Sequence, residues 1–180
     1  MENKNLTFEE YIASDEERVE QKKVISNFGI AATLIGAVLS ALAGTSLVPA
    51  GMASMLVGSV GLVVLIIGIT KLLSRKTVFV DKQSQEELKN SDIFFDTTEL
   101  GNISRLYEQR DFGSIANLKR GNQSGIVLHV CGSENGNLYY TQLMKYVPYQ
   151  YVPVFDAVKH TDANEVSALA TLVRLYSEKA

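Results

Sequence analysis

The sequence has only one cysteine, Cys131, among its 180 residues. One cysteine excludes an intramolecular disulfide, and it supplies too few thiolates for a zinc site. We therefore predict no metal site and no cofactor. Because free cysteine is among the most buried residue types, we expect Cys131 to lie buried in a strand.

Charge is absent from residues 24–70, a run of 47 residues without Asp, Glu, Lys, Arg or His. A helix rises about 1.5 Å per residue and the hydrocarbon core of a bilayer is about 30 Å thick, so one span needs about 20 residues. The run therefore has room for two spans and a short turn. We predict a transmembrane helical hairpin with spans at 24–43 and 50–73, because Gly44 can end the first helix and Pro49 can open the second.

The charges that flank this run predict its orientation. Basic residues precede the first span and follow the second, and none lies in the turn between them. The positive-inside rule then places both termini in the cytoplasm, in a multi-pass protein of the inner or plasma membrane. A cleaved signal peptide does not suit a run that begins behind an acidic segment. A solute transporter is also disfavoured, because neither span holds an ionisable side chain.

Small residues recur along one face of each predicted span. Inside lipid, helices associate through close backbone approach over such faces. The two spans can use these faces on each other, or the faces can build a homo-oligomer or a pore. The candidate helix-packing residues are Gly36, Ser40, Gly44, Ser54, Gly58, Gly61 and Gly68.

The segments beside the hairpin are charged but not basic. Residues 1–23 carry 4 basic and 7 acidic side chains, and residues 77–180 carry 10 and 13, which is too little positive charge for a nucleic-acid partner. Thr7 and Glu10 match a capping box, so we predict a cytoplasmic amphipathic helix over residues 1–23. Residues 74–91 are polar and suit a linker.

The remaining residues, 92–180, predict a small α+β cytoplasmic domain with a mostly antiparallel sheet. Residues 125–131 and 138–147 form the clearest hairpin signal, with Asn135-Gly136 in the turn. Prolines restrict any strand near residue 150 to a short one at a sheet edge. We predict a further strand at 93–96 and helices at 98–109, 111–120 and 163–177, the last capped by Asp162 with Glu165.

Five of the eight tyrosines lie within 13 residues: Tyr139, Tyr140, Tyr146, Tyr149 and Tyr151. Tyrosine suits binding surfaces but is equally at home in a sheet core, so both interpretations stay open. We expect Tyr149 and Tyr151 to share one strand face. His129 and Cys131 also share a face, but no third group that would orient them for catalysis is evident, so no catalytic residue is assigned.

Taken together, these patterns predict a membrane-anchored, non-enzymatic binding or scaffold protein. Its partners would be the lipid bilayer and an unknown protein or small ligand that the cytoplasmic domain recognises at the inner membrane face. The alternative is a membrane-disrupting or pore-forming effector, triggered when that domain binds a ligand or oligomerises. An enzyme with a site near His129 and Cys131 is the least favoured hypothesis.

Overall fold

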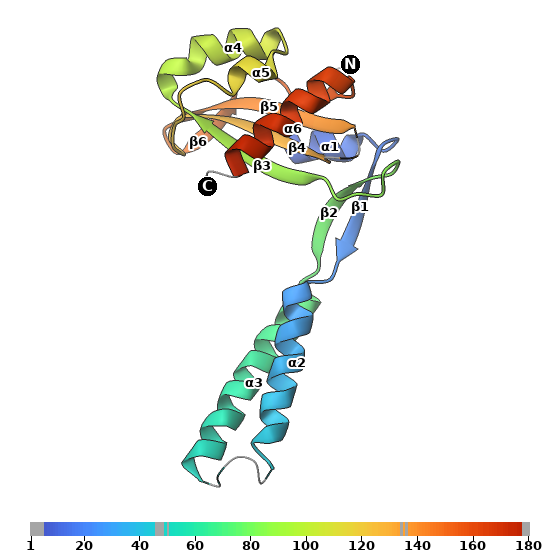
Figure 1. The fold of residues 1–180 in the computed structure, drawn as a ribbon, viewed down its shortest axis with the longest axis vertical. Helices are drawn as coiled ribbons and strands as arrows, with labels where there is room; N and C mark the ends of the chain where they lie inside the picture. Colours follow the sequence, from blue (N-terminus) through green and yellow to red (C-terminus); the bar gives the residue numbers. More distant parts are fainter. Residues whose placement is uncertain (1–5, 46–48, 50, 134, 136, 178–180) are drawn as a thin grey trace. The chain divides into compact units, whose positions relative to one another are not determined.

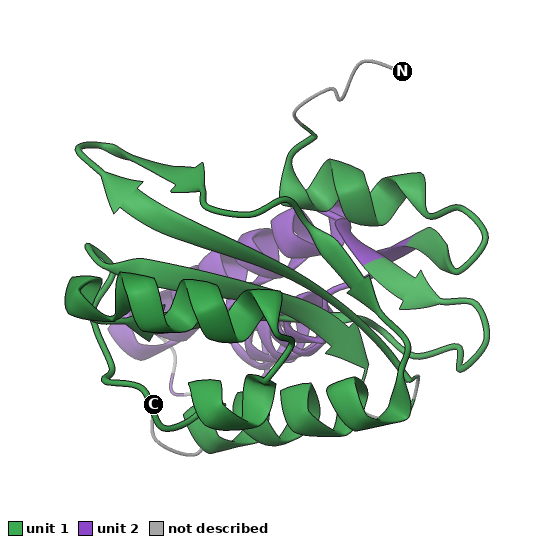
Figure 2. Cartoon of the chain, turned by 90° about the horizontal axis from the view of Figure 1, so that it is seen from above, with its two compact units in different colours: residues 1–21, 79–180 green, residues 22–78 purple. Residues whose placement is uncertain are grey.

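The computed structural model describes residues 6–45, 49, 51–133, 135 and 137–177. The chain forms two compact units: unit 1 comprises residues 1–21 and 79–180, and unit 2 comprises residues 22–78 (Figure 2). It passes from unit 1 to unit 2 within β1 (Val19–Val24) and returns within β2 (Lys76–Asp81). These two strands pair as a small sheet of their own. Figure 1 labels the elements.

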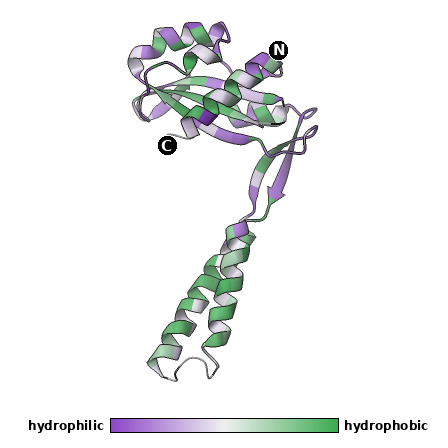
Figure 3. Ribbon diagram, in the orientation of Figure 1, coloured by the Kyte–Doolittle hydropathy of each residue, from purple (hydrophilic) through white to green (hydrophobic). Residues whose placement is uncertain are grey.

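Unit 2 is dominated by two apolar helices, α2 (Asn27–Leu42) and α3 (Met52–Leu73), which are coloured as hydrophobic in Figure 3. Among the described residues, α3 is the one helix long and apolar enough to cross a membrane. Its 22 residues span about 33 Å, whereas the 16 residues of α2 span about 24 Å. The predicted pair of full spans is therefore not confirmed, because helix α2 is shorter than the expected segment 24–43.

The two helices of unit 2 approach each other through glycine. A methyl group added at Gly36 would lie 2.3 Å from the backbone nitrogen of Leu65, and one at Gly68 would lie 2.4 Å from that of Thr33. A methyl group added at Gly61 would lie 2.6 Å from the backbone nitrogen of Ser40. Only a residue without a Cβ allows this backbone approach.

The other small residues of the predicted stripes lie toward the far end of the hairpin. An added methyl group at Gly58 would lie 3.3 Å from the Cβ of Ala43, a tight contact but a less severe one than those at Gly36, Gly61 and Gly68. At Gly44 it would meet only a carbonyl of its own helix, and the Ser54 hydroxyl donates to the carbonyl of Gly51 at 2.9 Å. The turn residues 46–48 and 50 lie outside the described residues.

Unit 1 is built on a five-stranded antiparallel sheet in the order β3-β4-β5-β6, with β7 also paired to β5. The strands are β3 (Lys89–Phe95), β4 (Ile126–Ser133), β5 (Leu138–Val147), β6 (Gln150–Pro153) and β7 (Val158–His160). The predicted hairpin of β4 and β5 is confirmed, although residues 134 and 136 of its turn lie outside the described residues. The α+β class with an antiparallel sheet is confirmed as well.

One face of this sheet is closed by α4 (Leu100–Glu108), α5 (Phe112–Ile115) and α6 (Ala163–Ser177). The 3-10 turn η1 (Thr97–Glu99) leads from β3 into α4. Alternate strand residues such as Ile93, Leu128 and Leu143 are fully buried against them. The final helix begins and ends where the sequence predicts. The Asp162 carboxylate accepts hydrogen bonds from the amides of Asn164 and Glu165, which caps its first turn.

Among the described residues, α1 (Phe8–Ser14) is the helix that packs on the opposite face, together with Val19, Phe79 and Leu88. It starts at the predicted Thr7–Glu10 capping box. Ile12 and Val19 are buried there against Cys131, Leu138 and Tyr140 in a second, smaller core. Because one helix of two turns cannot cover a sheet of this width, part of the face stays open. We call the covered side the closed face and this side the open face.

Three sequence predictions about secondary structure are wrong. Residues 1–23 do not form one helix, because the helix ends at Ser14 and β1 pairs with β2. The segment 74–91 is not a plain linker, since it contains β2 and the start of β3. The helix at 111–120 ends after Ile115, because Lys119 and Arg120 pair instead with the end of β3.

Candidate ligand-binding groove

A groove of about 680 Å³ opens on the open face of unit 1. Its lining comes from residues 6–9 at the start of α1 and from β3, β4, β5 and β6. Ligand sites in proteins have volumes of about 300–1,000 Å³ and combine apolar walls with a few polar groups, so this groove has the size of a small-molecule site.

The floor of the groove holds a histidine–aspartate pair. Antiparallel pairing of β3 with β4 sets Asp92 opposite His129, and the Asp92 carboxylate lies 2.6 Å from His129 Nδ1. A carboxylate only accepts hydrogen bonds, so Nδ1 carries the proton and Nε2 of the neutral ring is an acceptor. Among the described residues, Nε2 has no hydrogen-bond partner.

Gln142 lies opposite His129 on the next strand, β5, and also lines the groove. The residue is only 4% exposed, yet its side-chain amide makes no hydrogen bond in the part of the chain that the structure describes. Its amide atoms are not among the side-chain atoms sealed from solvent, so they are accessible from the groove. A ligand that pairs with this amide would replace water there.

Aromatic rings stand on two sides of His129. The Phe8 ring stacks on the imidazole with centroids 5.9 Å apart, and the Tyr151 ring meets it edge-on at 6.5 Å. Tyr146 in turn packs against Tyr151 at 5.4 Å. Met144 and Pro153 complete the apolar wall. The groove therefore offers flat apolar surfaces beside its polar floor.

The ionised side chains of the groove lining are acidic. Glu9 and Asp92 are carboxylates, and the lining contains no lysine or arginine. The first turn of α1, which reaches the groove, carries Glu9 and Glu10. The local charge is therefore unfavourable for phosphate or carboxylate ligands.

The five predicted tyrosines do not form one site. Tyr139 is buried in the core of the closed face, whereas Tyr140 is buried under α1. Tyr149 does not share a strand face with Tyr151, because it sits in the turn before β6 with φ 70° and is 98% exposed. Only Tyr151 lines the groove, with Tyr146 behind it.

Tyr140 instead fixes α1 to the sheet. Its hydroxyl donates to the Asp15 carboxylate at 2.6 Å, and the Lys159 ammonium pairs with the same carboxylate. Burial opposes ionisation of Asp15, but these hydrogen bonds outweigh it and hold the pKa below its ordinary value. Burial together with the Asp15 charge raises the pKa of Tyr140. The start of the groove is thus held by a charged anchor at the other end of α1.

Cys131 lies at a buried position of β4, as the sequence predicts. Burial raises the pKa of its thiol to about 12, so no thiolate is present near neutral pH. The Cys131–His129 pair therefore has the wrong protonation state for a nucleophilic site. Among the described residues, no group of three or more His, Cys, Asp or Glu side chains comes together to hold a metal ion.

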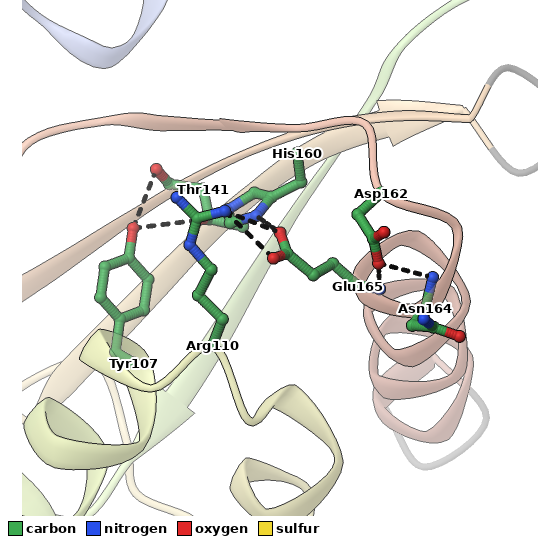
Figure 4. Close-up of polar contacts among 7 residues, drawn as sticks. All are labelled: Tyr107, Arg110, Thr141, His160, Asp162, Asn164 and Glu165. Carbon is green, nitrogen blue, oxygen red and sulfur yellow. Dashed lines mark hydrogen bonds and ion pairs between the residues drawn. The ribbon is translucent and has the colours of Figure 1, made fainter.

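A second polar constellation lies inside the closed face and is drawn in Figure 4. His160 Nδ1 lies 2.7 Å from the Glu165 carboxylate, and His160 Nε2 lies 2.8 Å from the Thr141 hydroxyl. The Tyr107 hydroxyl extends this series of hydrogen bonds and lies 2.9 Å from Thr141 Oγ1. Arg110 donates to the Glu165 carboxylate at 3.0 Å. No spacing in the sequence indicates this relay, because Tyr107 and Arg110 lie far along the chain from their partners Thr141 and Glu165.

The relay has the order carboxylate, imidazole, hydroxyl that acyl-transfer enzymes use. Here, however, Thr141 is fully buried and the His160 side chain is 1% exposed. Burial lowers the pKa of His160, although the Glu165 charge opposes this, and burial raises the pKa of Tyr107 to about 12. The relay ties α4 and α6 to β5 and β7, and it does not present a reactive group to solvent.

No family model, curated protein or solved structure matches the chain. The chemistry of the groove therefore has to be argued from its own residues.

Proposed function

We propose that the protein is a membrane-anchored, non-enzymatic receptor whose unit 1 binds a small ligand in the groove of the open face. The observation that carries this proposal is Gln142, a residue that is 4% exposed and lines the groove, and whose amide makes no hydrogen bond among the described residues. Its amide atoms are accessible from the groove, so they are available to a ligand or to water.

The anchor in this proposal is the hairpin of α2 and α3. Large apolar side chains on both helices are exposed in unit 2, among them Phe28, Leu34, Leu56 and Ile66. Such a surface is unfavourable in water and suits lipid. Helix α3 can cross a bilayer by its length, and the uncharged residues beside α2 would extend the shorter helix. With basic residues on both outer flanks, unit 1 would face the cytoplasm.

The pore-forming alternative draws no support from the glycine faces. Gly36, Gly61 and Gly68 are in backbone contact within the α2–α3 pair, so their surfaces are not left over for contacts between protomers. The non-enzymatic part of the proposal rests on the two groups of residues that resemble catalytic sites. Cys131 is a buried thiol and the His160 side chain is 1% exposed, so neither group is accessible to a substrate.

Ligand binding can be measured on the full chain in lipid nanodiscs through methionine methyl groups. The sequence has 4 methionines, of which Met144 lines the groove, whereas Met52 and Met55 belong to α3. We expect members of a fragment library to shift the methyl signal of Met144, assigned with Met144→Leu, and to leave the α3 signals in place. A library that moves none of these signals would overturn the proposal.

The topology has its own test, because the natural Cys131 is buried and should not react with a maleimide. In sealed right-side-out vesicles, Thr45→Cys should label with an impermeant reagent. Asn122→Cys, in an exposed loop of unit 1, should label only after the vesicles are opened. The reverse pattern would contradict a cytoplasmic unit 1.

A further inference from the structure

We infer that the groove ligand is an uncharged or cationic heteroaromatic ring that bears an amino group beside a ring nitrogen and carries no phosphate. Aminopurines and their nucleosides belong to this chemical class. The inference rests on the proposed ligand-binding function and adds the chemistry of the ligand. Its three parts are the polar floor, the aromatic walls and the charge of the groove.

The polar floor selects an edge with both a donor and an acceptor. The Gln142 amide offers one N–H group and one carbonyl from a single plane, which is the pairing that glutamine makes with the amino group and ring nitrogen of adenine. His129 lies opposite Gln142 in the strand register. Its Nδ1–H donates to the Asp92 carboxylate, so in the neutral tautomer Nε2 is an acceptor. A second N–H on the ligand would satisfy it.

The walls select a flat ring. Phe8 and Tyr151 both contact the His129 ring and line the groove, so an aromatic ligand in the groove would meet aromatic surfaces. Stacking of a base on an aromatic side chain contributes about 1–3 kcal/mol and does not depend on sequence-specific contacts. An aliphatic amine would satisfy the charge of the groove but not these surfaces.

The charge of the groove excludes nucleotides. Sites that bind phosphate groups use lysine, arginine or an unobstructed helix N-terminus. This lining has no lysine or arginine, and Glu9 and Asp92 would repel an added phosphate. A nucleoside should therefore bind more tightly than its monophosphate, which is the reverse of the order found at sites built for nucleotides.

The test uses the full chain in nanodiscs and the Met144 methyl signal. The probes are adenosine, purine riboside, which lacks the amino group, and adenosine monophosphate, which adds a phosphate. We expect adenosine to bind about tenfold more tightly than either of the others. Gln142→Leu should weaken adenosine binding about tenfold, while Gln150→Leu, a matched change at an exposed position of β6, should not alter it.

The outcomes separate this inference from the proposed function. If other fragments shift Met144 but adenosine does not, the ligand class is wrong and the groove is still a binding site. Equal affinity for adenosine and its monophosphate, or an equal effect of Gln142→Leu and Gln150→Leu, would also overturn the inference. The unliganded methyl spectrum of Gln142→Leu checks that the variant is folded. If no probe and no fragment moves the signal, the proposed function fails too.

Discussion

The two faces of the unit 1 sheet each contain a histidine bonded to a carboxylate, but the two histidines differ in how many of their ring nitrogens are bonded. On the closed face, His160 has both ring nitrogens bonded, to Glu165 and Thr141, and it is buried. On the open face, His129 has one nitrogen bonded to Asp92, and Gln142 beside it has no partner among the described residues. A polar group whose bonds are complete stabilises the fold, whereas one left incomplete at a groove is available to a ligand.

The largest difference in stability between the two faces should come from truncating two neighbouring side chains of β5. Leu143 is fully buried in the closed face, and Met144 lines the groove. We expect Leu143→Ala to lower the free energy of unfolding by about 2–5 kcal/mol because it leaves a cavity, and Met144→Ala to lower it by less than about 1.5 kcal/mol.

Urea unfolding of the full chain in nanodiscs, followed by near-UV circular dichroism, gives this comparison. There is no tryptophan, and all 8 tyrosines belong to unit 1, so the tyrosine band of the spectrum reports that unit alone. Equal losses for the two variants would show that the groove face is packed as tightly as the closed face.

The two carboxylates that hold the histidines form the next pair. Glu165→Ala leaves the buried His160 without its acceptor, and we expect a loss of about 1–3 kcal/mol in the free energy of unfolding. Asp92→Ala removes a partner that is 52% exposed, and the expected loss is about 0–0.5 kcal/mol. The same urea titration measures both losses. A larger loss for Asp92→Ala than for Glu165→Ala would contradict the conclusion that the His160 relay is buried and the His129–Asp92 pair is open to solvent.

The open face depends on the anchor of α1 for its groove. Tyr140→Phe removes the hydroxyl that donates to Asp15 but keeps the ring. We expect a loss of about 1 kcal/mol, because Lys159 still pairs with Asp15. Hydrogen exchange should rise for the amides of α1 and stay unchanged for α6. An equal rise in both helices would mean that Tyr140 supports the whole unit and not the groove wall.

Local patterns predicted the elements whose signals lie within a few residues. The capping box at Thr7, the hairpin of β4 with β5 and the helix Ala163–Ser177 all depend on near neighbours, and they are found where the sequence places them. The strand β1 was missed because its polar sequence forms a strand only through pairing with β2, more than fifty residues later. Tertiary pairing overrides weak local preference in such segments.

For the groove, too, the sequence predicted what depends on near neighbours and missed what depends on the pairing of distant segments. Tyrosine density pointed to the region of β5 and β6, and Tyr151 does line the groove. Density alone could not show that Tyr139 and Tyr140 point to opposite faces and into different cores. Asp92, His129 and Gln142 come together only through the register of three strands, which no spacing in the sequence reveals. The His160 relay was missed for the same reason.

The smallest expected effect is a decrease in the free energy of unfolding of unit 1 on acidification, caused by the buried histidine of the closed face. Burial lowers the pKa of His160 in spite of the Glu165 charge, so the folded state takes up its proton less readily than the unfolded chain. The stability that this provides is complete above about pH 6.5 and is lost as the pH falls below that value toward the folded-state pKa. Of the groups near His160, Tyr107 has a pKa of about 12, and Arg110 donates a hydrogen bond to Glu165.

Glu165 does not produce this slope, because hydrogen bonds from His160 and Arg110 outweigh its burial and hold the pKa of its carboxyl below the ordinary value. Unit 1 should therefore become less stable between about pH 7.5 and pH 5 in the urea titration. His160→Gln should flatten that dependence. A slope that survives unchanged in His160→Gln would show that a group other than the buried histidine senses the proton.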